Sequence, residues 1–267
     1  MAYAAVNGAD IYYEVMGEGP PLILIMGLGG NVDWWGTGFR KQLARTRQVI
    51  AFDNRGVGRS KAPDGSLTID QMADDVAGLL DALTIERTDL FGISMGGMIS
   101  QEFALRHGDR LNRLILGCTC CGGSKQIPPT PRAQQLLTTV ARPISSDEAM
   151  RCQAELLFPL DFIEKHHELL QAAHKMMVQV PTSPTNFLRQ LEAIQTWRGT
   201  YDRLSTLEHE TLLLHGAEDI LLPVQNSEIM HEVLQKSRLI QYEGCGHGFA
   251  VQVASRVVTD IQQFLST

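Results

Sequence analysis

The sequence has no long hydrophobic run. The longest apolar run near the start, Pro21–Met26, is far shorter than the roughly 20 residues that a membrane-spanning helix needs. It is also too distant from a basic N-terminal region to act as a secretion signal. Basic side chains form no long run either, and 23 Lys and Arg against 30 Asp and Glu leave a net charge of −7. We therefore expect a cytoplasmic protein whose partners include neither a membrane nor nucleic acid.

Cysteine pairs and zinc motifs are also missing. The five cysteines are an odd number, and Cys118, Cys120 and Cys121 crowd into one segment. A structural zinc site would need a second pair elsewhere, so buried free thiols are expected instead. No His-Glu pair has a second histidine three residues beyond the glutamate, so the zinc protease motif is absent. The sequence therefore predicts neither a metal nor another cofactor.

The length and composition of the chain are sufficient for one large domain. The chain has 267 residues, of which 44% are hydrophobic and 20% charged, as is typical of globular proteins. A chain of this length buries roughly three-quarters of its unfolded surface, so its core needs no disulfide or metal. It contains no internal repeat and no low-complexity tract.

Short apolar runs alternate with helical patterns over the first 120 or so residues. Ala2–Asn7 and Ala9–Met16 predict a β-hairpin, because the Asn-Gly pair between them supplies the positive φ of a tight turn. Thr68–Leu83 predicts a helix capped by Thr68 and Gln71. Continuous apolarity predicts strands that are buried on both faces. These strands are Pro21–Met26, Gln48–Phe52, Thr88–Phe91 and Arg113–Leu116.

From about Cys120 the strand signals stop for some seventy residues. Helices are predicted instead, with prolines between them, at Pro131–Arg142, Asp147–Phe158, Asp161–Val178 and Pro184–Trp197. The earlier rhythm resumes with strands at Thr211–Leu214 and Leu239–Tyr242 and a closing helix at Val251–Leu265. We predict an α/β core of residues 1–120 and 201–267, with a mostly parallel sheet flanked by helices. Residues 121–200 would form a helical cap, or lid, over a site in that core.

Ser94 is the first candidate for chemistry. It lies in Gly92-Ile93-Ser94-Met95-Gly96-Gly97, where a strand should end and a helix begin. A serine on such a sharp turn exposes its hydroxyl at the edge of the sheet, and the helix directs its amides to the same point. The alternative is a glycine-rich turn with a passive serine. The placement between strand and helix favours a nucleophile.

A serine nucleophile needs a base and an orienting acid. His247 is the best base, because it follows a late strand and has glycines on both sides. The other seven histidines lie on predicted helices or at strand ends and have structural explanations. Asp219 is the favoured acid, because it follows the strand Thr211–Leu214 and precedes the base in the chain. Glu218 is its rival.

Two backbone amides are candidates for stabilising an oxyanion. Met95 follows the nucleophile directly, and Leu28 lies in the glycine-rich loop after Pro21–Met26. Both positions are where an oxyanion hole forms beside a serine on this kind of turn. The loop could also be a flexible glycine turn.

Taken in order, these segments resemble the α/β-hydrolase superfamily over essentially the whole chain. The resemblance rests on the elbow at Ser94, on Asp219 and Gly246-His247, on Gly27-Leu28-Gly29-Gly30, and on Asp53-Asn54-Arg55-Gly56-Val57-Gly58-Arg59-Ser60. It implies the α/β-hydrolase fold, with the helical insert as the lid and the Asp53–Ser60 segment shaping the core near the site. Gly92–Glu102 and Leu111–Gly117 are similar to small carboxylesterases, methylesterases and 3-oxoadipate enol-lactonases. Many relatives have His-Gly where this chain has Met26-Gly27.

These observations predict a cofactor-free hydrolase of carboxylic esters. Ser94 would attack the ester carbonyl while His247 takes its proton, and water would then release the acyl group. A lactonase, a C–C bond hydrolase or a perhydrolase would use the same residues, and a ligand receptor on this fold is a more distant alternative. Substrate-binding candidates are Gly27, Trp35, Phe158 and Trp197, although the aromatic residues could equally serve packing. The partner would be a small ester or lactone, and the protein a monomer or homodimer.

Overall fold

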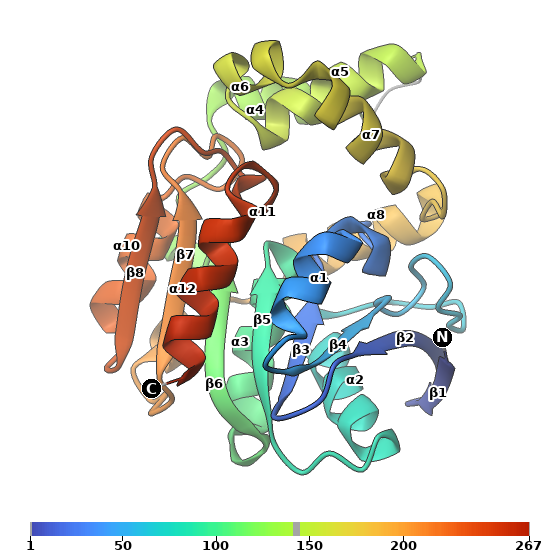
Figure 1. Cartoon of the computed structure of the whole chain (residues 1–267), viewed down its shortest axis with the longest axis vertical. Coiled ribbons are helices and arrows are strands. Elements are labelled where there is room, and N and C mark those ends of the chain that lie inside the picture. The colour runs from blue at the N-terminus through green and yellow to red at the C-terminus, as the bar shows by residue number, and fades with distance from the viewer. Residues whose placement is uncertain (1, 141–144, 267) are drawn as a thin grey trace.

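The structure is a computed structural model that describes residues 2–140 and 145–266. Arg142 and Pro143, which belong to a predicted helix end and break, lie outside the described residues. The elements alternate between strands and helices up to Gly117 and again from Thr211, as the sequence predicts (Figure 1). Within the described chain, no helix combines the length and apolarity that crossing a membrane requires. All five cysteines are buried and free.

A single eight-stranded sheet crosses the described part of the molecule in the order β1-β2-β4-β3-β5-β6-β7-β8. Strands β1 and β2 are antiparallel to each other, β2 is antiparallel to β4, and the remaining neighbours are parallel. The predicted mostly parallel sheet is thus confirmed. The strands are β1 (Ala2–Val6), β2 (Ala9–Met16), β3 (Pro21–Ile25), β4 (Gln48–Phe52), β5 (Thr88–Ile93), β6 (Leu111–Gly117), β7 (Thr211–Gly216) and β8 (Ser237–Tyr242).

The β1–β2 hairpin turns where the sequence predicts it. Asn7 has a φ of 47° and Gly8 a φ of 77°, so both turn residues adopt the left-handed conformation that a two-residue hairpin loop needs. The register pairs Val6 with Ala9 next to the turn and Ala2 with Tyr13 at the far end.

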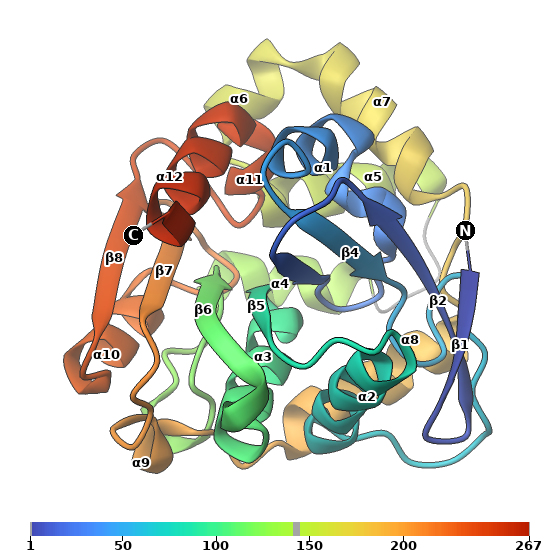
Figure 2. The ribbon, with the colours of Figure 1, turned by 60° about the horizontal axis from the view of Figure 1, so that its bottom comes forward.

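Helices cover both faces of the sheet and bury a hydrophobic cluster on each (Figure 2). One cluster joins the sheet to α2 (Ile69–Ala82), α3 (Met95–Arg106) and α10 (Gln225–Val233). The other joins it to α1 (Thr37–Leu43) and α12 (Ala254–Ser266). The shorter helices are η1 (Val32–Trp35), η2 (Gly108–Arg110), η3 (Gly123–Lys125), α9 (Tyr201–Leu204) and α11 (Phe249–Gln252).

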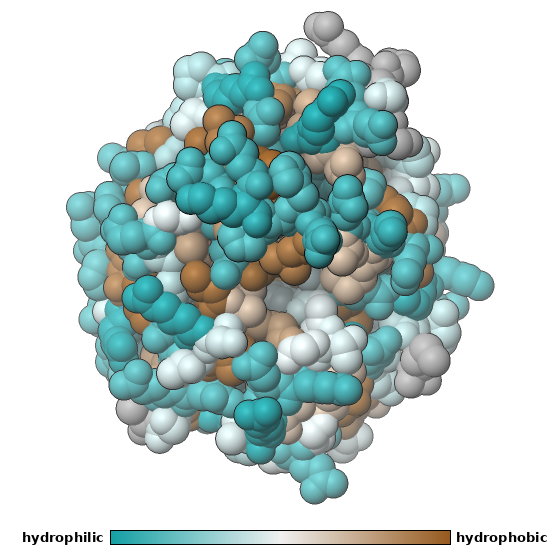
Figure 3. Space-filling model, turned by 45° about the horizontal axis from the view of Figure 1, so that its top comes forward, coloured by the Kyte–Doolittle hydropathy of each residue, from teal (hydrophilic) through white to brown (hydrophobic). Residues whose placement is uncertain are grey.

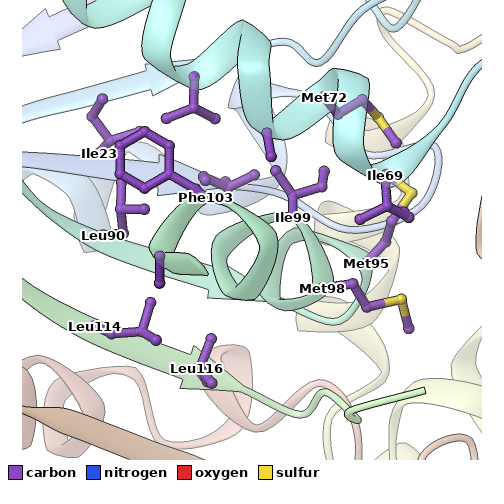
Figure 4. Close-up of a cluster of buried hydrophobic side chains, with 14 of the residues drawn as sticks. Ile23, Ile69, Met72, Leu90, Met95, Met98, Ile99, Phe103, Leu114 and Leu116 are labelled. Carbon is purple, nitrogen blue, oxygen red and sulfur yellow. The ribbon is translucent and has the colours of Figure 1, made fainter. Parts of the chain in front are cut away.

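Helix α3 lies at the centre of the first cluster, where it packs against β5 and β6 and beside α2. Its Ile99 and Phe103 are 0% exposed and lie between strand side chains such as Leu90 and helix α2 (Figure 4). Burying a side chain of this size completely contributes about 1.5–3 kcal/mol. The helix is therefore held rigidly, and so is its first turn, which begins directly after Ser94.

In the described residues, the region between η3 and α9, where the sequence lacks strand signals, holds five helices. They are α4 (Pro131–Val140), α5 (Ser146–Leu157), α6 (Leu160–Lys165), α7 (His167–Met177) and α8 (Pro184–Thr196). Helices α4 to α7 lie beyond the end of the sheet, at the top of Figure 1. Helix α8 lies lower and buries Ala193 in the α2–α3 cluster.

Two predicted helices are broken in the structure. The helix predicted at Asp161–Val178 is divided into α6 and α7, because the backbone at His166 leaves the helical conformation with φ −132° and ψ 37°. Its ring nitrogen Nδ1 lies 3.0 Å from the Phe162 carbonyl, which a continuing helix would pair with the His166 amide. The closing helix, predicted at Val251–Leu265, is likewise interrupted at Val253, between α11 and α12.

Candidate active site

Ser94 stands on a strained turn between β5 and α3. Its φ is 58° and its ψ −123°, a backbone conformation that costs a non-glycine residue energy and persists only where the surroundings enforce it. Two hydrogen bonds, to β6 and to the loop after it, hold the Ser94 backbone in this conformation. The Ser94 amide donates to the Gly117 carbonyl at 2.8 Å, and Thr119 Oγ1 donates to the Ser94 carbonyl at 2.8 Å.

The glycines around Ser94 allow the first turn of α3 to approach the sheet. A Cβ atom on Gly96 would lie only 2.0 Å from the Ile25 carbonyl oxygen, and one on Gly92 would lie 2.2 Å from the Gly96 carbonyl oxygen. Any side chain at either position would therefore force backbone apart. This close approach places the start of α3 against the end of β3, where the loop with Leu28 begins.

His247 and Asp219 come together from two neighbouring loops. Asp219 follows β7 and His247 follows β8, and Nδ1 of His247 lies 2.7 Å from Oδ2 of Asp219. Both residues are buried. Glu218, the rival acid, has an exposed side chain, so the structure pairs His247 with the favoured candidate.

Asp219 is surrounded by hydrogen-bond donors. Its Oδ1 accepts from the backbone amides of Leu221 and Leu222 at 2.8 and 2.9 Å, and Oδ2 lies 3.3 Å from Nε2 of His215. Burial alone raises the pKa of Asp219, but the imidazoles of His247 and His215 and their hydrogen bonds outweigh it and hold the pKa well below its ordinary value. Asp219 is thus a fixed negative charge facing Nδ1 of His247.

Ser94 and His247 line one apolar cavity of about 380 Å³. No hydrogen bond joins the Ser94 hydroxyl to His247 within the described residues, and such bonds often tighten only when substrate binds. The molecule is hollowed on the face that carries helices α4 to α8, and apolar residues gather around the hollow (Figure 3). Residues of the inserted helices supply much of the lining, among them Leu137, Ala149, Leu156, Leu157, Met177 and Phe187.

The structure brings three of the four predicted substrate-binding residues to this cavity. Gly27, Trp35 and Phe158 line it. Trp197 does not, because its indole Nε1 donates to Glu102 at 2.8 Å and its ring lies against Gly122. Trp197 therefore fastens the end of α8 to α3, away from the cavity, and the expectation that it contacts substrate is corrected.

The two predicted oxyanion donors flank Ser94. Met95 is the first residue of α3, and Leu28 follows Gly27, where a Cβ atom would lie 3.0 Å from the Ser94 Cβ. Both Leu28 and Gly27 line the cavity. Among the described residues, neither the Leu28 nor the Met95 amide has a hydrogen-bond acceptor. Both are therefore free to donate to a bound oxygen.

The loop that carries Leu28 is anchored at both ends by the segment after β4. Asn54 Nδ2 donates to the Met26 carbonyl at 3.0 Å, and Asp53 Oδ1 accepts from the Val32 amide at 2.7 Å. The sequence resemblance assigned this segment to shaping the core near the site, but the individual roles of Asp53 and Asn54 have no signal in the sequence. They arise because β3 and β4 are neighbours in the sheet.

One group of side chains has the composition of a metal site. Potential ligand atoms of Cys118, His215 and Asp219 lie within 4.8 Å of one another. His215 already bonds Ser227 through Nδ1 and the Leu222 carbonyl through Nε2, at 2.6 and 2.7 Å. Burial raises the pKa of the Cys118 thiol well above its ordinary value, and the nearby Asp219 charge adds to this, whereas a metal needs the thiolate. The group therefore fits a hydrogen-bonded support for Asp219.

The chain resembles known hydrolases over nearly its full length. Residues 20–252 match the family model for the alpha/beta hydrolase fold. A 2-hydroxymuconate semialdehyde hydrolase of Pseudomonas sp. is 30% identical over 94% of this chain and 88% of its own length. Two solved structures, an enol-lactonase from Burkholderia xenovorans and a thermophilic esterase from Thermogutta terrifontis, are each 25% identical with a TM-score of 0.83. Both cover 99% of this chain, and this chain covers 100% and 97% of theirs. With the fold and this similarity together, the chain belongs to the α/β-hydrolase family.

Proposed function

We propose that the protein hydrolyses carboxylic esters of small, largely apolar substrates through an acyl-enzyme on Ser94. The observation that carries the proposal is the buried 2.7 Å contact between His247 and Asp219, next to a cavity that Ser94 also lines. A serine on a strand-to-helix turn, a histidine and a buried carboxylate form the charge arrangement that acyl transfer needs.

Each residue has a distinct step in this reaction. His247 removes the hydroxyl proton as Ser94 Oγ bonds to the ester carbonyl carbon, and it returns that proton to the alcohol as the carbon–oxygen bond breaks. Asp219 fixes the His247 tautomer and stabilises the imidazolium. The amides of Leu28 and Met95 donate to the carbonyl oxygen while it carries negative charge. Water then attacks the acyl-enzyme by the same route, which releases the acid and restores Ser94.

The cavity favours a neutral and apolar substrate. None of the described residues that line it is Lys, Arg, Asp or Glu, and its polar side chains other than tryptophan are Ser94, Gln153 and His247. A carboxylate buried there would lose its hydration without gaining a cation. Trp35 and Phe158 supply flat apolar walls, and Gly27 leaves room beside Ser94. We further propose that residues 121–200 act as a cap, because helices within this range close the cavity.

The relatives carry names of different reactions, so the bond that is cleaved must be tested directly. Purified protein should be assayed side by side with p-nitrophenyl esters of short and long acyl chains, lactones, a carbamate and a C–C hydrolase substrate. We expect the highest kcat/KM for short-chain neutral esters. A higher kcat/KM for the lactone or for the C–C substrate would replace the ester assignment while keeping the proposed roles of Ser94, His247 and Asp219.

Replacing Ser94 tests the chemistry itself. Ser94→Ala removes the nucleophile without adding bulk, so ester turnover should fall by at least about 10³-fold, and the circular dichroism spectrum should stay unchanged. Ser100→Ala is the matched control, because this buried serine on the same helix bonds the Gly96 carbonyl. Wild-type turnover in Ser94→Ala would contradict the proposal. A burst of one equivalent without turnover in the wild type would instead indicate a receptor.

A further inference from the structure

The middle of the loop that carries Leu28 is held by the segment before α8 and by α8 itself. Asp53 and Asn54 anchor only its two ends. At the centre, the Gly29 amide donates to Oε1 of Gln190 at 2.8 Å, and Thr182 Oγ1 donates to the Gly29 carbonyl at 2.8 Å. Both peptide groups of Gly29 are therefore bound by side chains that lie more than 150 residues away in the chain.

Two further contacts belong to the same joint, by which we mean the contact of the loop around Gly29 with α8 and the segment before it. Asn31 Nδ2 donates to the Val180 carbonyl at 2.7 Å, which is the second hydrogen bond between the loop and the segment before α8. The Phe187 ring packs on Gly29, where a Cβ atom would lie 2.9 Å from Cδ2 of the ring. Gly29 itself has a φ of 69°, a conformation that favours glycine. A side chain at position 29 would therefore strain the backbone and press on the Phe187 ring.

Gln190 makes its contribution through one atom. The residue is completely buried, and within the described chain its Nε2 has no hydrogen-bond partner. An unpaired buried amide group destabilises a fold, and a leucine or methionine would fill the same space without this penalty. The acceptor Oε1 is thus the feature of Gln190 that the structure uses, and its partner is the Gly29 amide.

We propose that Gln190 and Thr182 are positioning residues for the oxyanion hole. Gln190 fixes the Leu28–Gly29 peptide group and Thr182 the Gly29–Gly30 peptide group. Together they set the direction of the Leu28 amide toward the carbonyl oxygen of the substrate. This inference rests on the proposed function, because the oxyanion forms only during acyl transfer. It also assigns the inserted helices a second role, since the segment that helps to close the cavity holds part of the catalytic machinery.

The main test removes the acceptor at Gln190. Loss of a whole oxyanion donor costs about 10²–10³-fold in rate, so a misdirected Leu28 amide in Gln190→Met should lower kcat by roughly ten- to a hundredfold. KM should change by less than about threefold, because the ground-state ester needs the amide little. An alkyl boronic acid, which forms a tetrahedral adduct with the serine, should bind more weakly by a factor close to the loss in kcat.

Matched variants separate positioning from packing. Gln195→Met makes the same change on the exposed face of α8 and should keep wild-type kinetics. Thr182→Val removes the hydroxyl at nearly constant shape and should lower kcat, whereas Thr182→Ser keeps the hydroxyl and should restore it. Two results would overturn the inference. One is a kcat for Thr182→Ser that is no higher than the kcat for Thr182→Val. The other is a change in KM with an unchanged kcat in Gln190→Met.

The inference and the proposed function fail in different ways. If Gln190→Met keeps the wild-type kcat, the positioning role is overturned while ester hydrolysis stands. If the wild type cleaves no ester, the proposed function fails, and amide hydrogen exchange still tests the joint. Faster exchange of the Gly29 amide in Gln190→Met than in Gln195→Met would then support it, and equal exchange would overturn it.

Discussion

Ser94 keeps a left-handed φ although it is not glycine, and the contacts around it explain why. Its amide and carbonyl are bound by Gly117 and Thr119, and the glycines beside it remove the Cβ atoms that would collide with the sheet. The strain is thus enforced by the neighbouring strands. The same pattern holds at Asp219, where two backbone amides and two histidines surround one carboxylate.

The lowered pKa of Asp219 makes a prediction about stability and pH. The charged carboxylate favours the folded state, so its contribution is fully present above the unfolded value of 3.8 and is lost as the pH falls through the lower folded pKa. In Asp219→Asn the free energy of unfolding should fall by about 1.5–3 kcal/mol at pH 6. The difference in the free energy of unfolding between the wild type and Asp219→Asn should become smaller as the pH falls below 3.8.

Urea unfolding at a series of pH values measures this gap. Glu218→Gln is the matched control, because its exposed side chain neighbours Asp219 in the chain and should change stability by less than about 0.5 kcal/mol throughout. A difference between wild type and Asp219→Asn that stays constant from pH 6 to pH 3 would contradict the assignment of the fixed charge.

At the scale of elements, helix α2 shows how local signals suffice for a well-patterned helix. Its predicted bounds, Thr68–Leu83, match the observed Ile69–Ala82 once the capping residues are counted, and Thr68 is the N-cap. Met72 and Val76 face the hydrophobic cluster, as the helical spacing predicts. The break at His166 shows the opposite case, because there a side chain competes with the backbone for the Phe162 carbonyl.

The N-cap of α2 offers a test at this scale. Thr68 Oγ1 accepts from the Gln71 amide at 3.1 Å, so Thr68→Ala should lower the free energy of unfolding by about 1 kcal/mol. Thr68→Ser keeps the acceptor and should recover most of this. Thermal or urea denaturation of the three proteins decides the question. Equal losses in both variants would show that the threonine methyl group, not the cap, stabilises the helix.

At the scale of the whole molecule, the cavity forms where distant parts of the chain meet. The loop after β3, the elbow at Ser94, the inserted helices and the segment of His247 after β8 all contribute to its lining. None of the described lining residues is Lys, Arg, Asp or Glu, while the chain carries a net charge of −7. Both facts disfavour anionic substrates.

This charge distribution predicts discrimination between otherwise similar esters. A dicarboxylic acid monoester with a free carboxylate should be hydrolysed with a kcat/KM at least about 100-fold below that of its neutral diester, because the carboxylate would be desolvated without a partner. Initial-rate assays at pH 7.5 on the two compounds measure the ratio. Gln153→Lys adds a cation to the cavity and should therefore bring the kcat/KM of the charged monoester closer to that of the neutral diester. Equal rates for the two esters would show that the charged group stays in solvent.

The sequence alone determined the features that depend on near neighbours in the chain. Continuous apolar runs predict the buried strands, helical spacing predicts α2, and the order of the segments predicts a core with a helical insert. The elbow at Ser94 can be predicted for the same reason, since its glycines, the serine and the start of the helix are consecutive residues. The pairing of His247 with Asp219 was inferred from chain order, and the 2.7 Å contact supplies its geometry.

The tertiary structure decided the contacts between residues that no local pattern links. It turned Trp197 toward Glu102 and away from the cavity, and it brought Gln190 to Gly29. A single glutamine on an amphipathic helix carries no periodic or motif signal, and its partner depends on how α8 packs on the core. Packing geometry, set by the summed contacts of the whole chain, therefore determined the lining of the cavity and the support of the loop that carries Leu28.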